Sequence, residues 1–252
     1  MKPTQKLATG ILAAGTAVMA LSTQAAIQYD QNVTPDIIFG TGNANGHFAT
    51  DQENGVELGL RAKVRYQETY NSNGAGTYTF QAGTAWNFEW SINSDYSGTV
   101  GHDLNYYTYA LRIDTDPTAG TSFTTFDPVN GVNPGNGMVL WDHGIGNNST
   151  ANGAGDDDVA TRTASDYATL IAQNNVAQNS WRQIWFGIDA NTPGTYTFQL
   201  EAFSPTGAPA ALTEMTVDVL PVPEPATYVA GMLLLLPFGF SAVRRLRRTP
   251  IA

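Results

Sequence analysis

The segment Val56–Tyr66, VELGLRAKVRY, decides the fold class because its side chains alternate without a slip. Its even-numbered positions are apolar, and its odd-numbered positions are polar or glycine. A period of two places successive side chains on opposite faces of an extended chain, so this segment predicts a β-strand. We expect one face of the strand to be buried and the other to contact water.

The same alternation recurs along the central part of the chain, and no long helical pattern separates the segments. Further strands are predicted at Trp86–Asn93, Tyr107–Ile113, Met138–Trp141, Trp181–Ile188, Thr195–Phe203 and Leu212–Leu220. Successive strands without intervening helices favour antiparallel pairing. We therefore predict a mainly β domain over residues 26–220, an antiparallel β-sandwich or jelly-roll-like fold, with one short helical segment around Ser165–Asn174.

Turns and loops fit this interpretation. Asn-Gly occurs six times, and both residues accept the positive φ that tight hairpins require. The hexapeptide GTYTFQ occurs at residues 76–81 and again at 194–199. We interpret the two copies as the same hairpin structure used twice within a single domain, and not as a tandem duplication. The segment Asp142–Asp158 has no apolar anchor at its centre and is expected to be a mobile surface loop.

Residues 1–25 at the N-terminus have the pattern of a secretory signal. Two lysines precede a small, apolar stretch, and small residues follow, which places cleavage between Ala25 and Ala26. The alternative, an uncleaved membrane anchor, is less consistent with a run this short and rich in alanine and glycine.

The C-terminus carries a second apolar segment, Ala226–Val243, with no charged residue in its 18 positions. It is long enough to cross a hydrocarbon core as a helix. The basic end at 244–248 comprises Arg244, Arg245, Arg247 and Arg248. Arginines directly after a span stay cytoplasmic, so the preceding domain is expected on the periplasmic side of the inner membrane.

Pro223, Glu224 and Pro225 lie just before this span. Pro-Glu-Pro, an apolar span and a terminal arginine cluster, in this order, resemble the PEP-CTERM sorting signal. The resemblance covers Val222–Arg248, about a tenth of the chain. It implies processing by exosortase, a transpeptidase-like membrane enzyme of Gram-negative bacteria that make exopolysaccharide. It describes delivery and leaves the activity of the domain open; a plain C-terminal anchor is the alternative.

The composition excludes several kinds of site. There is no cysteine, hence no disulfide, no thiolate metal site and no lipid on an N-terminal cysteine. The chain has a net charge of −10, but residues 26–221 hold 21 acidic and six basic residues and carry −15. Such a surface argues against nucleic-acid binding and suits either plain solubility or Ca²⁺-dependent matrix contact.

Catalytic motifs are missing from the sequence. It has no Gly-x-Ser-x-Gly, no HExxH and no phosphate-binding glycine loop. His47, His102 and His143 are far apart in polar or glycine-rich contexts, which predicts solvated loop histidines. Glu57 and Glu89 are the candidate carboxylates for a glycosidase, although surface glutamates on strands are common. We predict that the protein is not an enzyme.

No cofactor is predicted, with Ca²⁺ as the alternative. Asp114 and Asp116 end a predicted strand, and Asp156, Asp157 and Asp158 close the long loop. Carboxylates in flexible loops are suitable Ca²⁺ ligands, but aspartate is also a routine turn former.

Aromatic residues suggest where a sugar would bind. Trp86, Phe88 and Trp90 share one side of one strand, and Trp181 and Trp185 share one side of another, as core residues do. Three rings near turns, Tyr70, Tyr106 and Trp141, are the candidates for an exposed ligand-binding surface.

Together these observations predict a signal peptide at 1–25, an exported domain at 26–220 and a sorting tail at 221–252. The predicted protein is a non-catalytic surface or extracellular-matrix protein associated with exopolysaccharide or biofilm. Its predicted processing partners are signal peptidase and exosortase. The alternatives are a carbohydrate-binding module, with or without Ca²⁺, and a secreted hydrolase.

Overall fold

The structure is a computed structural model that describes residues 26–131, 142–157 and 162–223. The predicted strand Met138–Trp141 lies outside the described residues, as do the signal segment and the tail from Glu224 onward. Within the described residues, no helix combines the length and the apolarity that a membrane crossing requires.

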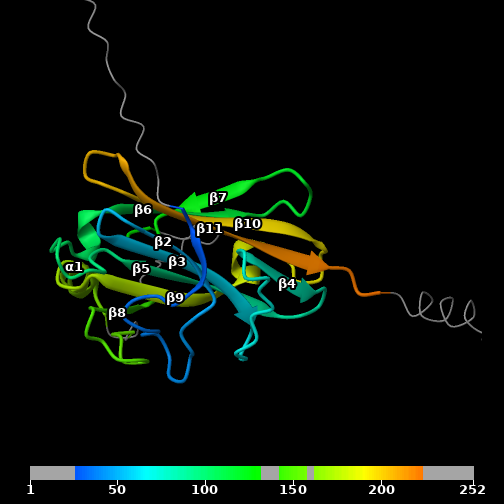
Figure 1. Cartoon of the computed structure of the whole chain (residues 1–252), viewed down its shortest axis with the longest axis horizontal. Coiled ribbons are helices and arrows are strands. Elements are labelled where there is room, and N and C mark those ends of the chain that lie inside the picture. Colours follow the sequence, from blue (N-terminus) through cyan, green and yellow to red (C-terminus); the bar gives the residue numbers. More distant parts are fainter. Residues whose placement is uncertain (1–25, 132–141, 158–161, 224–252) are drawn as a thin grey trace, which may run out of the picture.

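The described chain forms two β-sheets packed face to face, which confirms a mainly β, sandwich-like fold (Figure 1). The strands of the first sheet, in spatial order, are β1 (Gln28–Gln31), β2 (Phe48–Glu53), β3 (Val56–Val64), β5 (Trp86–Asn93), β9 (Val176–Arg182) and β8 (Gly144–Gly146). Those of the second sheet are β4 (Thr77–Gln81), β11 (Pro209–Leu220), β10 (Gly194–Phe203), β6 (Thr108–Asp114) and β7 (Phe123–Phe126).

Helical elements in the described part of the chain are few and short. They are the 3-10 helices η1 (Leu104–Tyr106) and η2 (Gln183–Phe186) and the α-helix α1 (Ala164–Ile171). Helix α1 overlaps the predicted segment Ser165–Asn174 but begins one residue before it and ends three residues before its end. Thr163 and Asp166 form a reciprocal capping box at its start, which satisfies backbone N–H groups that have no partner inside the helix.

Pairing in the second sheet is mixed, which corrects the prediction of an antiparallel domain. Strand β4 runs parallel to β11, whereas β10 runs antiparallel to β11 on the other side. The two copies of the hexapeptide therefore flank the same strand, and Tyr78 and Tyr196 both lie opposite Val217. The chain continues from β4 into the first sheet, so no hairpin forces β4 to run antiparallel to β11.

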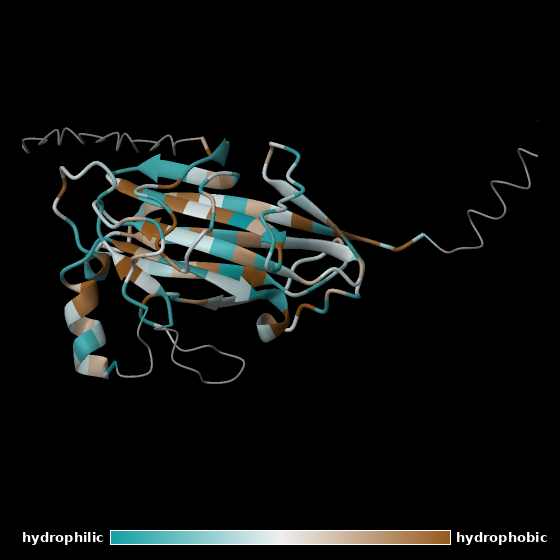
Figure 2. Ribbon diagram, turned by 90° about the horizontal axis from the view of Figure 1, so that it is seen from below, coloured by the Kyte–Doolittle hydropathy of each residue, from teal (hydrophilic) through white to brown (hydrophobic). Residues whose placement is uncertain are grey.

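The core lies between the sheets and is rich in aromatic rings. Polar and apolar residues alternate along the strands (Figure 2), and the apolar ones face inward. Trp86, Phe88 and Trp90 are 0 % exposed, as predicted. Trp181 is also buried and meets Phe88 edge to face at 6.0 Å. Burial of these rings supplies much of the hydrophobic stabilisation of the domain.

The predicted strand Trp181–Ile188 is wrong beyond its second residue. Strand β9 ends at Arg182, and the chain then turns through the 3-10 helix η2. Because of this turn, Trp185 does not share the buried face of Trp181 and is 46 % exposed.

The outer face of the first sheet is covered by chain, which the alternation did not predict. Residues 33–47, which we call the covering segment, cross this face between β1 and β2 (blue in Figure 1). Val33, Ile37 and Ile38 of this segment are at most 2 % exposed. Both faces of the central strands β3 and β5 are consequently buried over most of their length.

The predicted mobile loop Asp142–Asp158 is ordered structure in its described part. Strand β8 lies in it and pairs with β9, and Ile145 is 2 % exposed. The N–H groups of Gly153 and Gly155 donate to the carbonyls of Ile37 and Ile38, each at 2.9 Å. This segment thus supports the covering segment through backbone hydrogen bonds. Its polar composition gave no indication of this role.

Gly59 offers a test of how closely the covering segment is packed. A Cβ at Gly59 would lie 2.6 Å from Cγ1 of the buried Val33. We expect Gly59→Ala to lower the free energy of unfolding by about 1–3 kcal/mol through overpacking. Hydrogen exchange should show faster opening of residues 33–39, while β10 and β11 stay protected.

Gly120→Ala is the matched control, because its nearest neighbour is the end of the part-exposed Asp116 side chain at 3.1 Å. We expect this variant to change the free energy of unfolding by less than about 0.5 kcal/mol. Equal effects of the two substitutions in urea unfolding would show that the covering segment is not tightly packed on β3.

Candidate functional site

Buried charges lie on the outer face of the first sheet, under the covering segment. Arg61 and Glu89 are opposite each other on β3 and β5, and both are 0 % exposed. Nε of Arg61 donates to Oε2 of Glu89 at 2.6 Å. Nζ of Lys63 lies 3.1 Å from Oε1 of the same carboxylate. Buried charges are costly unless they are paired, so each member of this group depends on the others.

Arg61 also holds the covering segment in place. Its NH1 donates to the carbonyls of Ala44 and Gly46, at 2.9 and 2.7 Å. Its guanidinium lies 4.3 Å from the ring centroid of Phe48 and 4.7 Å from that of Tyr70. One side chain therefore satisfies backbone acceptors that the segment buries and packs between two rings.

Glu57 has the same kind of role further along β3. It is 0 % exposed, and it accepts hydrogen bonds from the backbone N–H of Thr34 at 2.5 Å and from the side chain of Gln52. Burial raises the pKa of Glu57, and these hydrogen bonds act in the opposite direction. The expectation that Glu57 and Glu89 are surface glutamates is wrong, because the covering segment lies over both.

Beside the buried charges, the outer face opens into a groove of about 480 Å³. The groove is lined by residues of the covering segment, of β3 and the turn after it, of β5 and of β9. They are Phe39, Thr41, Gly42, Asn43, Lys63, Tyr66, Glu68, Asn87 and Ser180. Its size is within the usual range of small-ligand sites.

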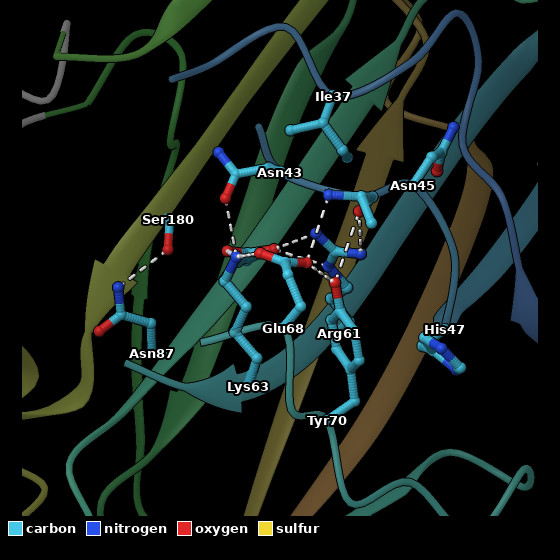
Figure 3. Close-up of polar contacts among 12 residues, drawn as sticks. Ile37, Asn43, Asn45, His47, Arg61, Lys63, Glu68, Tyr70, Asn87 and Ser180 are labelled. Atoms are coloured by element: carbon cyan, nitrogen blue, oxygen red, sulfur yellow. Dashed lines mark hydrogen bonds and ion pairs between the residues drawn. The ribbon is translucent and has the colours of Figure 1, made fainter. Parts of the chain in front are cut away.

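Polar side chains in the groove are held by one another (Figure 3). Nζ of Lys63 donates to Asn43 at 2.8 Å and to Glu68 at 2.9 Å, and Asn87 donates to the hydroxyl of Ser180 at 2.9 Å. Burial acts to raise the pKa of Glu68, but hydrogen bonds from Tyr70 and Lys63 prevail and lower it. The groove thus presents fixed amide, hydroxyl and charged groups, which suit a polar ligand.

Tyr66 stands at the groove and is 86 % exposed. The alternation of Val56–Tyr66 grouped it with the buried residues, which is wrong because β3 ends at Val64 and Tyr66 has a φ of 62°. The guanidinium of Arg65 stacks over its ring at 4.3 Å, and NH2 of Arg65 donates to its hydroxyl. An exposed, supported ring beside polar groups can stack on the apolar face of a sugar.

The three aromatic residues predicted to form an exposed ligand-binding surface differ in exposure and position. Tyr70 is only 7 % exposed, so its expected exposure is wrong; its ring packs against Arg61 and its hydroxyl contacts Glu68. Tyr106 is 42 % exposed and stacks on His102 at 3.5 Å, beyond the other end of β5 from the groove. Trp141 lies outside the described residues.

The candidate Ca²⁺ ligands lie in separate places. Asp114 ends β6 in the second sheet, is 1 % exposed, and accepts from the N–H groups of Asp116 and Ser122. Asp156 contacts Arg162 at 2.8 Å on the side of the first sheet. Asp157 is exposed, and Asp158 is outside the described residues. Among the described residues no group of three or more His, Asp or Glu is arranged to hold a metal ion.

The prediction of solvated histidines is wrong for His143. It is 1 % exposed, its ring meets Trp90 edge to face at 5.2 Å, and its Nε2 lies 2.8 Å from the hydroxyl of Tyr167. Burial, with a smaller effect of the Arg162 charge, lowers the pKa of His143 to about 3. This histidine is a neutral core residue at physiological pH.

The processing residues lie at or beyond the limits of the described chain. Ala26 is the first described residue and is exposed, and Pro223 is exposed just after β11. Ala25, Glu224, Pro225 and the four arginines at 244–248 lie outside the described residues. Their predicted roles in processing therefore stay predictions.

Sequence reasoning missed the groove because its residues come from four separate segments. Lys63, Asn87 and Arg182 are consecutive partners across β3, β5 and β9, but register is set by pairing and is not visible in one strand. Comparison with protein-family models, with curated proteins and with solved structures gave no match. The site therefore has to be interpreted from its own geometry.

Removing the charge of Glu89 should strongly destabilise the domain. We expect Glu89→Gln to lower the free energy of unfolding by about 3–5 kcal/mol, because it leaves the buried Arg61 without its carboxylate. The matched control is Glu201→Gln. Glu201 pairs with Arg112 at 2.7 Å, with side chains 13 % and 28 % exposed. There we expect a loss of about 1 kcal/mol or less. Similar losses in urea unfolding would contradict a special role for the buried pair.

Protonation of His143 should destabilise the domain in acid. The unfolded chain binds a proton near the ordinary pKa of 6.5, whereas the folded chain binds it only near a pKa of about 3. The contribution of His143 is therefore complete above pH 6.5 and falls by about 1.4 kcal/mol per pH unit between these values.

The measurement is urea unfolding of the native chain and of His143→Gln between pH 7.5 and pH 4.5. The stability difference between the two should shift toward the variant as the pH falls. Tyr167→Phe, which keeps the histidine, should retain the acid sensitivity of the native chain. A difference between native chain and His143→Gln that is constant with pH would contradict the assignment.

Proposed function

We propose that this protein is an exported, exosortase-sorted protein of the cell surface or extracellular matrix, with a non-catalytic domain associated with exopolysaccharide. The observation that carries the proposal is the order of three features at the C-terminus: Pro223-Glu224-Pro225, the apolar segment 226–243 and the arginines of 244–248. An N-terminal segment with the pattern of a secretory signal supports the same route.

The structure supports a non-catalytic role for the two glutamates that a glycosidase would use. Glu89 is bound to Arg61 and Lys63, and Glu57 is bound to Thr34 and Gln52. Both carboxylates are 0 % exposed, so neither faces a surface that a polysaccharide could reach. A general acid or a nucleophile has to contact its substrate, and these two side chains contact the covering segment and the strands instead.

The second candidate function is a carbohydrate-binding module. The groove favours it, since an exposed ring, amides and a hydroxyl are gathered within one opening. The two functions are compatible, because a matrix protein that binds the polysaccharide of its own cell would do both.

The sorting tail is tested in a strain that lacks this protein. We expect the native chain to restore matrix cohesion and to appear as a shortened product outside the inner membrane. A chain with alanines at Pro223, Glu224 and Pro225 should accumulate uncut in the inner membrane and leave cohesion unrestored. Membrane fractionation with intact-mass measurement reports the first effect, and resistance of the biofilm to shear reports the second.

Pro221→Ala is the control, because it changes a nearby proline and keeps the motif. It should mature like the native chain. Normal maturation of the triple variant would refute exosortase sorting, and unchanged cohesion in the strain without the protein would refute the matrix role.

A further inference from the structure

Most basic residues of this acidic domain lie on one face. Residues 26–221 contain six basic residues among 21 acidic ones. Four of the six follow the outer face of the first sheet at the groove: Arg61, Lys63, Arg65 and Arg182. The cations of this acidic domain are therefore concentrated on one face, where they alternate with the carboxylates of Glu57, Glu68 and Glu89.

Two of these four cations form ion pairs within the fold, and the other two are available to bind a ligand. Glu89 and Glu68 neutralise Arg61 and Lys63. Within residues 26–131, 142–157 and 162–223, neither Arg65 nor Arg182 has a carboxylate at ion-pair distance. The Nε atom of each is buried without a hydrogen-bond partner, although each side chain as a whole is part-exposed. A part-exposed guanidinium without a carboxylate partner inside the fold suits a carboxylate ligand, which would contact its exposed end.

Both arginines are adjacent to the groove. Arg182 lies opposite Asn87, which lines the groove. The N–H of Arg65 donates to the carbonyl of Ala85 at 2.9 Å, and Ala85 and Arg182 line a neighbouring hollow of about 270 Å³. The open surface therefore continues across β5 from Tyr66 to Arg182. We call the residues Arg65, Tyr66, Asn87, Ser180 and Arg182 the basic strip.

The carboxylates that line the two openings have partners inside the fold. Glu68 accepts from Lys63, from Tyr70 and from the N–H of Ala44. Asp189 accepts from the backbone and the side chain of Asn191, at 2.9 and 2.8 Å. These hydrogen bonds lower the pKa of Asp189, so its carboxylate stays ionised. Because it repels a negatively charged ligand, such a ligand has to approach on the side of Arg182.

We propose that the basic strip binds a segment of an acidic polysaccharide whose sugars carry carboxylates. The ring of Tyr66 stacks on a pyranose face, Arg182 and Arg65 bind carboxylates of the chain, and Asn87 and Ser180 bind hydroxyls. That the ligand is a polymer outside the cell rests on the function proposed above. The charge and the ring argue for the ligand chemistry independently. The −15 charge of residues 26–221 disfavours a polyphosphate such as a nucleic acid, which contacts a far larger basic surface.

The test is binding of the full chain, purified in detergent, to immobilised polygalacturonate and to the same polymer with its carboxyls methyl-esterified. We expect retention on the free acid and at least about tenfold weaker retention on the ester, since the ester removes the charged partner of the arginines. Biolayer interferometry at low and at physiological salt measures both, and the difference should shrink as salt rises.

Variants assign the binding to the basic strip. Arg182→Gln and Tyr66→Ala should each weaken binding of polygalacturonate by about tenfold. Arg112→Gln, which removes a cation on the second sheet, should bind like the native chain. Arg65→Gln is a second charge variant, so the proposal stays testable if thermal melting shows that Arg182→Gln unfolds.

Three results would overturn the proposal. They are no retention on polygalacturonate, alginate and hyaluronan alike, equal retention on the acid and the ester, and tighter binding of a single-stranded oligonucleotide than of any polyuronate. Failure here is distinguishable from failure of the proposed function, because sorting and cohesion are read in cells through the tail. A protein that is sorted normally but binds no acidic polymer would refute only the present inference.

Discussion

Arg61 and Glu89 face each other across β3 and β5 without access to water, and the outer layer of the domain depends on their contact. The pair neutralises charges that the covering segment buries, and Arg61 extends to two carbonyls of that segment. Gln178 acts in the same way from β9, since its side chain accepts from Ile38 and donates to Asp36. A loop can be buried only where its backbone groups find partners, and here the outward polar side chains of the sheet supply them.

This arrangement also explains where the open surface lies. Along β9, Gln178 is under the covering segment and is fully buried, whereas Ser180 and Arg182 are part-exposed. Along β5, Glu89 is covered, and Asn87 lines the groove. The same outward positions serve two purposes, and their distance from the covering segment decides which. Side chains under it, such as Glu89 and Gln178, hold the loop, whereas Asn87, Ser180 and Arg182 are part-exposed at the open surface.

Covered and open positions on the outer face of the first sheet should respond differently to substitution. Substitutions in the covered rows disturb paired, buried groups and act on stability. Substitutions in the basic strip act on exposed or part-exposed groups and should have little effect on the fold. On the proposed function, such a domain can adapt to a different polysaccharide through a few residues at the end of β3, the start of β5 and the end of β9.

Much of the sheet architecture could be predicted from the sequence. The alternation placed β3, β5, β6, β10 and β11 nearly at their observed bounds, and the apolar faces of these strands form the core. Period two determines which residues share a face, because side chains of an extended chain must alternate. Strands β1, β2, β4, β7 and β8 were not among the predicted strands. Of these, β1, β7 and β8 have four residues or fewer, which hold too little periodicity to be recognised.

What the sequence by itself determined is therefore the strand class and the inward faces, together with two terminal segments that resemble a secretory signal and a sorting signal. Only the tertiary structure decided what lies against the outward faces. Alternation predicts that Glu57, Arg61 and Glu89 are on the side of the sheet away from the core. That side can contact either water or another segment of the chain. The covering segment, placed by contacts between residues far apart in the chain, buries these three and ends before Asn87 and Arg182. Contacts of that kind depend on register and topology, which no single strand records.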